Sequence, residues 1–153
     1  MKVTNGNLIT LALQGEFDLI IHGCNCFCAM DAGIAKSIKQ AFPQAWDADL
    51  KTPIGDKNKL GTFSQAAITI DNHSKLLVIN AYTQFHWSGK DDLVEYKSLR
   101  KIFNQIKLQF HGKRIGYPQI GAGLAGGNWQ KISQIIDEEL KGENHTLVIF
   151  DGS

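Results

Sequence analysis

The segment Tyr117-Pro118-Gln119-Ile120-Gly121-Ala122-Gly123-Leu124 decides the fold, because it joins a short predicted strand to a glycine-rich loop. The loop continues to Gly127, and Asn128 can cap a following helix with apolar positions from Trp129 to Leu140. Glycines leave backbone N–H groups uncovered, and a helix N-terminus adds further N–H groups and the positive end of its dipole. The pattern predicts a phosphate-binding loop. A tight turn without a ligand is the alternative.

Strands and amphipathic helices alternate on both sides of this loop. The predicted strands cover 17–22, 63–70, 76–81, 114–117 and 146–150, and the predicted helices 34–42, 43–50, 99–110 and 129–140. This alternation predicts an α/β fold, a three-layer α/β/α sandwich with a mixed, mainly parallel central sheet. Ligands of such sheets bind beyond the carboxyl ends of strands, where the loops after His22 and Tyr117 lie.

Length and composition describe an ordinary globular chain. The 153 residues are expected to form one domain, 1–153, and the shares of 43% hydrophobic and 20% charged residues exclude collagen-like, mucin-like and disordered chains. Lys and Arg number 16 against 15 Asp and Glu, a formal charge of +1. This balance predicts no general affinity for nucleic acid or for an anionic membrane.

Targeting signals and cysteines give two further expectations. No apolar run approaches the roughly 20 residues of a membrane span, and the first residues carry no signal-peptide pattern, so we expect a cytoplasmic protein. Cys24, Cys26 and Cys28 alternate, and no second Cys or Cys/His pair completes a zinc site. We expect reduced structural thiols and no metal, with a site using His22 as fourth donor as the less favoured reading.

The loop after the first predicted strand carries the polar candidates. Asn25 could donate to and accept from a sugar hydroxyl, or it could simply cap the loop. Gly33 opens a helix and offers a second set of N–H groups. His22 could transfer a proton near neutral pH, although a buried, hydrogen-bonded histidine is the more common arrangement.

Two other features have weaker meanings. Gly121, Gly123 and Gly126 match a dinucleotide fingerprint, with Asp151 after the next strand, but the fingerprint normally opens its fold and here almost closes the chain. Phe85 and Trp87 flank His86 in a predicted loop and could wall a pocket or simply pack.

Four motifs in order resemble the macrodomain family, the ADP-ribose-binding α/β/α fold, over nearly the whole chain. They are Gly6-Asn7-Leu8-Ile9-Thr10, His22-Gly23-Cys24-Asn25-Cys26, Met30-Asp31-Ala32-Gly33-Ile34-Ala35 and the quoted Tyr117–Leu124 segment. The branch is similar to yeast-type ADP-ribose 1''-phosphate phosphatases and the terminal ADP-ribose-protein glycohydrolase. The resemblance implies a small-molecule ADP-ribose derivative as partner, with ADP-ribosylated macromolecules as a further possibility, and it implies no cofactor.

The resemblance also implies residue roles. Asn25 would bind the distal ribose, His22 matches a histidine of the phosphatase-like members, and the amides of Gly33 and Ile34 would bind one phosphate. The diphosphate would lie against Gly121, Ala122, Gly123 and Leu124. Adenine would be flanked by Asn7, Leu8 and Ile9, with Phe150 as the candidate to stack on it.

The sequence departs from the family pattern in three respects. Asn7 replaces an Asp that bonds the adenine amino group, although an amide can still accept that bond. The Lys and Asp of the glycohydrolase relatives are replaced by Thr83 or Gln84 and by Ala125, so a lysyl-adduct mechanism is not expected. Asp31 replaces a Gly near the distal ribose. It could act as a base, repel a terminal phosphate or cap the next helix, and we favour capping.

The leading expectation is therefore an enzyme that hydrolyses ADP-ribose 1''-phosphate, with His22 and Asn25 at the reacting phosphate. The alternatives are an ADP-ribosyl hydrolase acting on modified protein or nucleic acid, and a reader module that binds ADP-ribose without turnover.

Overall fold

The computed structural model describes residues 1–71, 73–88, 93–123 and 125–153. Leu124, which was expected in the diphosphate loop, lies outside the described residues. The elements in chain order are β1 (Lys2–Gly6), α1 (Leu8–Leu13), β2 (Leu19–Cys24), α2 (Gly33–Ala41), α3 (Pro43–Leu50), η1 (Lys57–Lys59), β3 (Phe63–Thr69), β4 (Lys75–Tyr82), α4 (Tyr96–Gln109), β5 (Arg114–Tyr117), α5 (Trp129–Glu139) and β6 (Asn144–Phe150).

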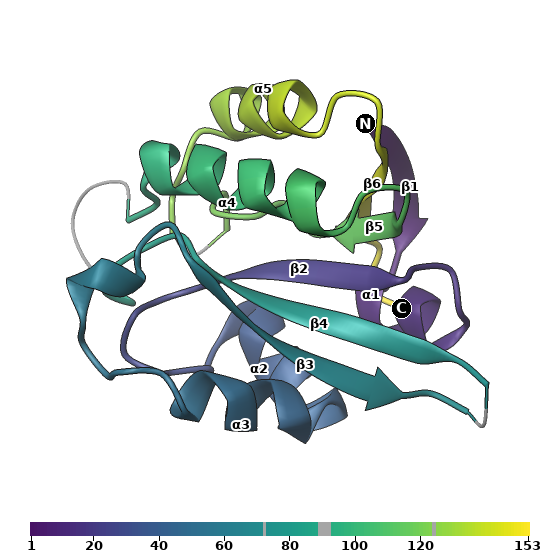
Figure 1. Cartoon of the computed structure of the whole chain (residues 1–153), viewed down its shortest axis with the longest axis horizontal. Helices are drawn as coiled ribbons and strands as arrows, with labels where there is room; N and C mark the ends of the chain where they lie inside the picture. The colour runs from purple at the N-terminus through teal and green to yellow at the C-terminus, as the bar shows by residue number, and fades with distance from the viewer. Residues whose placement is uncertain (72, 89–92, 124) are drawn as a thin grey trace.

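The strands form one sheet in the order β1-β6-β5-β2-β4-β3. Every neighbouring pair is parallel except β3 with β4, so the sheet is mixed and mainly parallel. Figure 1 shows α4 and α5 over one face of the sheet and α2 and α3 over the other. The predicted three-layer α/β/α architecture is confirmed.

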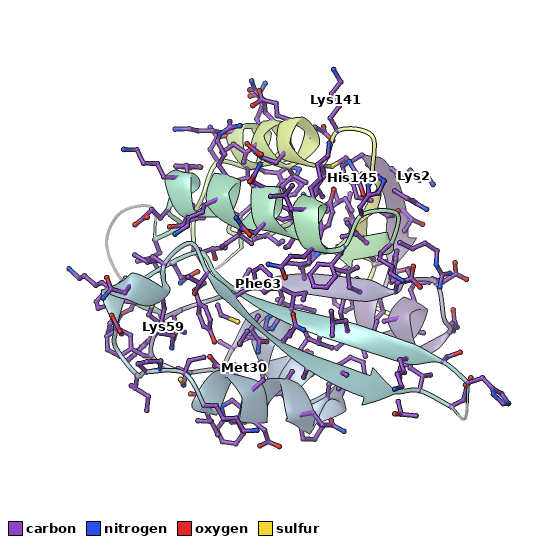
Figure 2. All side chains as sticks on the ribbon, in the orientation of Figure 1. Lys2, Met30, Lys59, Phe63, Lys141 and His145 are labelled. Atoms are coloured by element: carbon purple, nitrogen blue, oxygen red, sulfur yellow. The ribbon has the colours of Figure 1, made fainter. Side chains whose placement is uncertain are left out.

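Two apolar cores lie on the two faces of the sheet, and β2 contributes to both. Ile21 packs in the core formed with α4 and α5, whereas Ile20 packs in the core formed with α1, α2 and α3. Figure 2 labels a residue of each core: Phe63, which packs against the first, and Met30, which lies within the second. A strand covered on both faces needs a continuous apolar run, which explains the sequence of β2.

The first strand and helix were not predicted from the sequence. Four of the five residues of β1 are exposed, so this edge strand lacks an apolar run, and α1 is only six residues long. The strand forms because it pairs in parallel with β6, from Lys2 opposite Thr146 to Gly6 opposite Phe150. This long-range pairing brings Asn7 to the carboxyl end of the sheet. None of the helices in the described parts of the chain is long and apolar enough to cross a membrane.

Candidate functional site

A cavity of about 1010 Å³ opens at the carboxyl ends of β2, β5 and β6. The predicted site residues that line it are Asn7, Leu8, Ile9, Asn25, Asp31, Gly33, Ile34, Gly121, Gly123 and Phe150. Two others do not line it: Ala122, between the lining residues Gly121 and Gly123, and His22, which is buried. Leu124 lies outside the described residues. The topology therefore brings the two predicted loops and the segment after β1 to one cavity.

Different structural reasons explain the presence of glycine at several positions of the loop after β5. A Cβ on Gly121 would lie 2.8 Å from Val94 Cγ2, and one on Gly127 would lie 2.5 Å from Val94 Cγ1, so packing requires glycine at both. Gly126 has a φ of +70°, which favours glycine. For Gly123 neither explanation applies, because its φ is outside the left-handed region and a Cβ would meet no atom of the described residues within 4 Å, its two chain neighbours aside. Its bare main chain faces the cavity.

Backbone hydrogen bonds hold this loop in a compact turn. The N–H of Gly127 donates to the carbonyl of Gly121 over 2.7 Å, and that of Gly126 donates to the carbonyl of Gly123 over 3.1 Å. Asn128 then caps α5, as expected, because its Oδ1 accepts from the N–H of Lys131 over 3.2 Å. No partner within the described residues is recorded for the N–H of Gly121 or Gly123.

The N-terminus of α2 opens on the opposite side of the cavity. Its N-cap residue is Ala32, which supplies no side-chain cap, and Gly33 and Ile34 line the cavity directly after it. The favoured role of Asp31 as a helix cap is therefore wrong: its side chain is 79% exposed and lies 3.5 Å from Lys39 Nζ. Helix N–H groups without a side-chain cap and a glycine main chain face the same space, which suits an anion.

Asn25 lines the cavity and also stabilises the loop that contains it. Its Oδ1 accepts from the N–H of Phe27 over 2.9 Å, and its Nδ2 donates to the carbonyl of Ala29, also over 2.9 Å. The loop-cap interpretation is thus correct for these atoms. The Nδ2 group of Asn25 has two protons. One is donated to Ala29, and no described residue accepts the other. That proton is available for a ligand hydroxyl at the wall where Asn25 lies.

His22 lies beneath the cavity and not in it. The side chain is fully buried, and its Nε2 donates to Asn80 Oδ1 over 2.6 Å. Asn80 in turn donates to the carbonyl of Ala45 and to Ser64, which fixes its orientation. Burial lowers the pKa of His22 to about 4, and the bond to Asn80 opposes that shift only in part. The expected proton-transfer role at the site is therefore corrected: His22 is a neutral, buried side chain.

Asn7, which also lines the cavity, uses both side-chain atoms in hydrogen bonds within the chain. Its Oδ1 accepts from the N–H groups of Ile9 and Thr10 over 3.0 and 3.1 Å, so it caps α1. Its Nδ2 donates to the carbonyl of Ser153 over 2.9 Å. The bond expected from the adenine amino group would thus be a third one to Oδ1. Phe150, in contrast, is 68% exposed and remains open to stacking.

Sequence reasoning missed some of the cavity wall and a buried polar cluster beside it. Gln84 lines the cavity without having been expected there, whereas Trp87 lines it in agreement with one of the two alternatives that the sequence left open. Thr83 is buried behind Gly23, with its Oγ1 2.8 Å from where a Cβ on Gly23 would lie. The cluster includes Lys59, labelled in Figure 2, which donates to the carbonyl of Cys26 over 3.0 Å. Its other members are Cys28, Asp49 and Tyr82. Lysine and aspartate in an exposed-looking segment gave no signal of burial.

The three cysteines are free and buried. Burial raises the pKa of Cys24, which lines the cavity, and also that of Cys26. Across the described residues no group of three or more His, Cys, Asp or Glu side chains is placed to hold a metal ion. The polar groups at the described wall include main-chain amides, the side-chain amides of Asn25 and Gln84, the Ser37 hydroxyl, the Cys24 thiol and the Asp31 carboxylate.

A parallel-sheet α/β sandwich with a glycine-rich loop and a helix N-terminus facing one cavity is the architecture of a known class. The chain belongs to the Macro domain family, whose model matches residues 21–136. It is 36% identical over 142 residues to an uncharacterized 17.5 kDa protein of Enterobacteria phage T4, covering 90% of this chain and 88% of that protein.

Two other relatives carry more descriptive names. A DNA ADP-ribosyl glycohydrolase of Thermus aquaticus is 23% identical over 146 residues, which cover 92% of this chain but only 38% of that protein. Thermosipho africanus DarTG, solved in complex with ADP-ribose, superposes with a TM-score of 0.75 at 15% identity, over 97% of this chain and 42% of that chain. The structural likeness shows the shared fold.

Proposed function

We propose that the protein binds ADP-ribose derivatives and hydrolyses the bond at carbon 1'' of the distal ribose. The observation that carries the binding is Gly123, whose missing side chain neither packing nor backbone conformation requires. A diphosphate held against this loop would also meet the uncapped N-terminus of α2. The ADP-ribose complex of a relative with the same fold supports this choice of ligand.

The order of the strands gives the ligand a direction. Phe150 is the last residue of β6 and Asn7 follows the edge strand β1, whereas Asn25 follows β2, which lies two strands beyond β6. Adenine at Phe150 would place the diphosphate at the loop after β5 and the distal ribose at Asn25. The reacting carbon would then lie on the side of the cavity where Asp31 is found.

Asp31 is the feature that favours a glycosidic bond over a phosphate ester. It is the one charged side chain among the described residues of the cavity wall. A carboxylate can accept a proton from water while the water oxygen bonds to carbon 1'' and the bond to the acceptor breaks. The electron pair leaves with the acceptor atom, which takes up the proton. We therefore place ADP-ribosyl hydrolase activity on a modified macromolecule first.

The expected hydrolysis of ADP-ribose 1''-phosphate is the second candidate. The free N–H groups at Gly33 and Ile34 favour it, since they could hold a terminal phosphate beside Asn25. Against it, the described wall offers no Lys, Arg or His to a dianionic phosphate, and Asp31 would repel it. Removal of the charge should therefore have opposite effects on the two reactions.

Asp31→Asn separates these candidates in one assay. We would incubate wild type and variant with ADP-ribosylated peptide, ADP-ribosylated DNA and ADP-ribose 1''-phosphate, and measure released ADP-ribose and inorganic phosphate. The proposal expects wild type to release ADP-ribose from a macromolecule and Asp31→Asn to lose roughly 100-fold or more of that rate. Phosphate release that rises in Asp31→Asn would support the phosphatase instead. Tight ADP-ribose binding without any turnover would leave the reader function.

A further inference from the structure

Four aromatic rings from two loops form a cluster at the Asn25 end of the cavity. Phe27, two residues after Asn25, packs edge-on against Phe85, His86 and Trp87 with centroid distances of 4.9, 5.2 and 5.5 Å. His86 stacks on Trp87 at 3.8 Å with an interplanar angle of 25°. The N–H of Cys26 donates to the carbonyl of Phe85 over 2.9 Å, which joins the two loops. The cluster is therefore a fixed part of the rim.

Trp87 is the member of this cluster that reaches the cavity. It lines the cavity and is 53% exposed, whereas Phe27, Phe85 and His86 are half-buried and do not line it. Much of the apolar surface of the Trp87 indole is therefore exposed to water, and the cluster does not bury it. A surface of this kind at the rim of a binding cavity is typical of a contact site for a ligand.

The position of Trp87 in the sheet order tells which part of a ligand it would meet. Trp87 comes after β4, which lies beyond β2 when the sheet is followed from β6. Phe150 at the opposite end is 68% exposed, so the cavity has an open aromatic side chain at each end. If Phe150 meets adenine and Asn25 meets the distal ribose, Trp87 lies past carbon 1'', where the acceptor is attached.

We propose that Trp87 is a stacking platform for the base of an ADP-ribosylated nucleic acid. This inference rests on the proposed function and names the acceptor that it acts on. A nucleobase presents a planar π-face, and stacking on an aromatic side chain contributes strongly to binding without base-specific hydrogen bonds. The platform thus holds the base while the bond at carbon 1'' is open to water.

The charge beside the cluster favours a nucleotide over a peptide. Lys57 Nζ lies 5.0 Å from the centroid of the Phe85 ring, on an exposed side chain of η1. A lysine there can contact a phosphate of the strand that carries the modified base. Because the formal charge is only +1, an unmodified strand should gain little electrostatic binding energy. The affinity for the substrate should therefore come mainly from its ADP-ribosyl group.

Binding measured in the Asp31→Asn background tests the platform without turnover. We would titrate fluorescein-labelled DNA carrying one ADP-ribosylated base, an ADP-ribosylated peptide, unmodified DNA and free ADP-ribose. The variants are Trp87→Ala, Trp87→Phe and Leu108→Ala. Leu108 is 70% exposed on α4 and lies outside the cavity wall, so it controls for the loss of an exposed apolar side chain.

We expect the modified DNA to bind more tightly than free ADP-ribose, and Trp87→Ala to weaken it roughly tenfold or more. Trp87→Phe should retain most of the affinity, and Leu108→Ala all of it. Affinity for ADP-ribose and for the peptide should change less than about twofold, since neither places a base on the indole. Unmodified DNA should bind weakly to every variant.

Three results would overturn the platform. One is equal affinity of the Asp31→Asn protein with Trp87 intact for modified DNA and for free ADP-ribose. Another is a Trp87→Ala variant that binds the modified DNA normally. The third is an equal loss for DNA and peptide, which would make Trp87 a general contact for protein acceptors. If the stacking role of Trp87 is contradicted but ADP-ribose still binds, the proposed function stands. If the protein does not bind ADP-ribose at all, both the stacking role and the proposed function are contradicted.

Discussion

The carboxylate of Asp31 lies 3.5 Å from the ammonium group of Lys39, on the cavity rim. Lys39 Nζ is itself 3.6 Å from the centroid of the Trp46 ring, and Trp46 Nε1 donates to the carbonyl of Cys28 over 3.3 Å. Asp31 is therefore oriented from outside the cavity by a side chain that is held on an indole. This arrangement replaces the helix cap that the sequence suggested.

Removal of Lys39 tests whether that orientation matters for turnover. Lys39→Met should lower kcat severalfold and leave KM and the Kd for ADP-ribose nearly unchanged, because Lys39 does not line the cavity. Lys39→Arg should restore most of the rate. An exposed ion pair contributes only about 0–1 kcal/mol, so thermal unfolding should move little. Equal rates for all three proteins would exclude a positioning role.

The buried His22 predicts a pH dependence of folding. Its pKa is about 4 in the folded state against 6.5 when exposed, so the unfolded chain binds the extra proton between these values. Stability from this group is complete above pH 6.5 and is lost as the pH falls toward 4. Between pH 7.5 and pH 5 the loss should be roughly 2 kcal/mol.

Urea unfolding of wild type and His22→Gln at both pH values isolates this contribution. The variant is expected to be less stable at pH 7.5, because Asn80 loses its short bond, but to lose less stability on acidification. The titration of the carboxylates affects both proteins equally, so it cancels when the pH-dependent free energies of unfolding are subtracted. Parallel pH profiles for the two would contradict a neutral, buried His22.

Tyr82 and Asp49 give a stability prediction away from the cavity. The Tyr82 hydroxyl donates to Asp49 Oδ1 over 2.7 Å, while Oδ2 is buried without a hydrogen-bond partner among the described residues. Tyr82→Phe should therefore cost about 1–3 kcal/mol, since it leaves a buried carboxylate with fewer donors. Tyr117→Phe is the matched control, because its buried hydroxyl bonds a neutral ring nitrogen, Nδ1 of His145, over 2.6 Å. A smaller loss for Tyr82→Phe than for Tyr117→Phe in thermal unfolding would argue against this account.

Local sequence patterns predicted the parts of the molecule that are determined locally. The apolar run of β2, the stripes of α4 and α5 and the cap at Asn128 all follow from residue spacing, and with them the order of strands and helices. The glycine-rich loop was found for the same reason. Residue spacing does not predict which backbone N–H groups remain free of partners once the loop is packed.

The failures concern contacts between distant segments. β1 is an exposed edge strand that exists through its pairing with β6, and no run of apolar residues announces it. His22 is neutral because the fold buries it completely, and the bond that β4 supplies through Asn80 opposes this lowering of its pKa only in part. Trp87 has its place because Phe27 packs against it from another loop. The position of Asp31 just before Gly33 suggests a helix cap, but Ala32 holds the N-cap position and the Asp31 carboxylate pairs with Lys39 instead.

The central claim is that bare main chain at Gly123 binds the diphosphate of an ADP-ribose derivative, and calorimetry of ADP-ribose binding to wild type and Gly123→Val tests it most directly. The φ of Gly123 and the lack of a contact from a Cβ to the described residues beyond its chain neighbours predict a folded variant with an unchanged melting temperature. The Kd should rise roughly tenfold or more, because the new side chain would cover the main chain. A folded Gly123→Val protein that binds ADP-ribose as tightly as wild type would contradict the account.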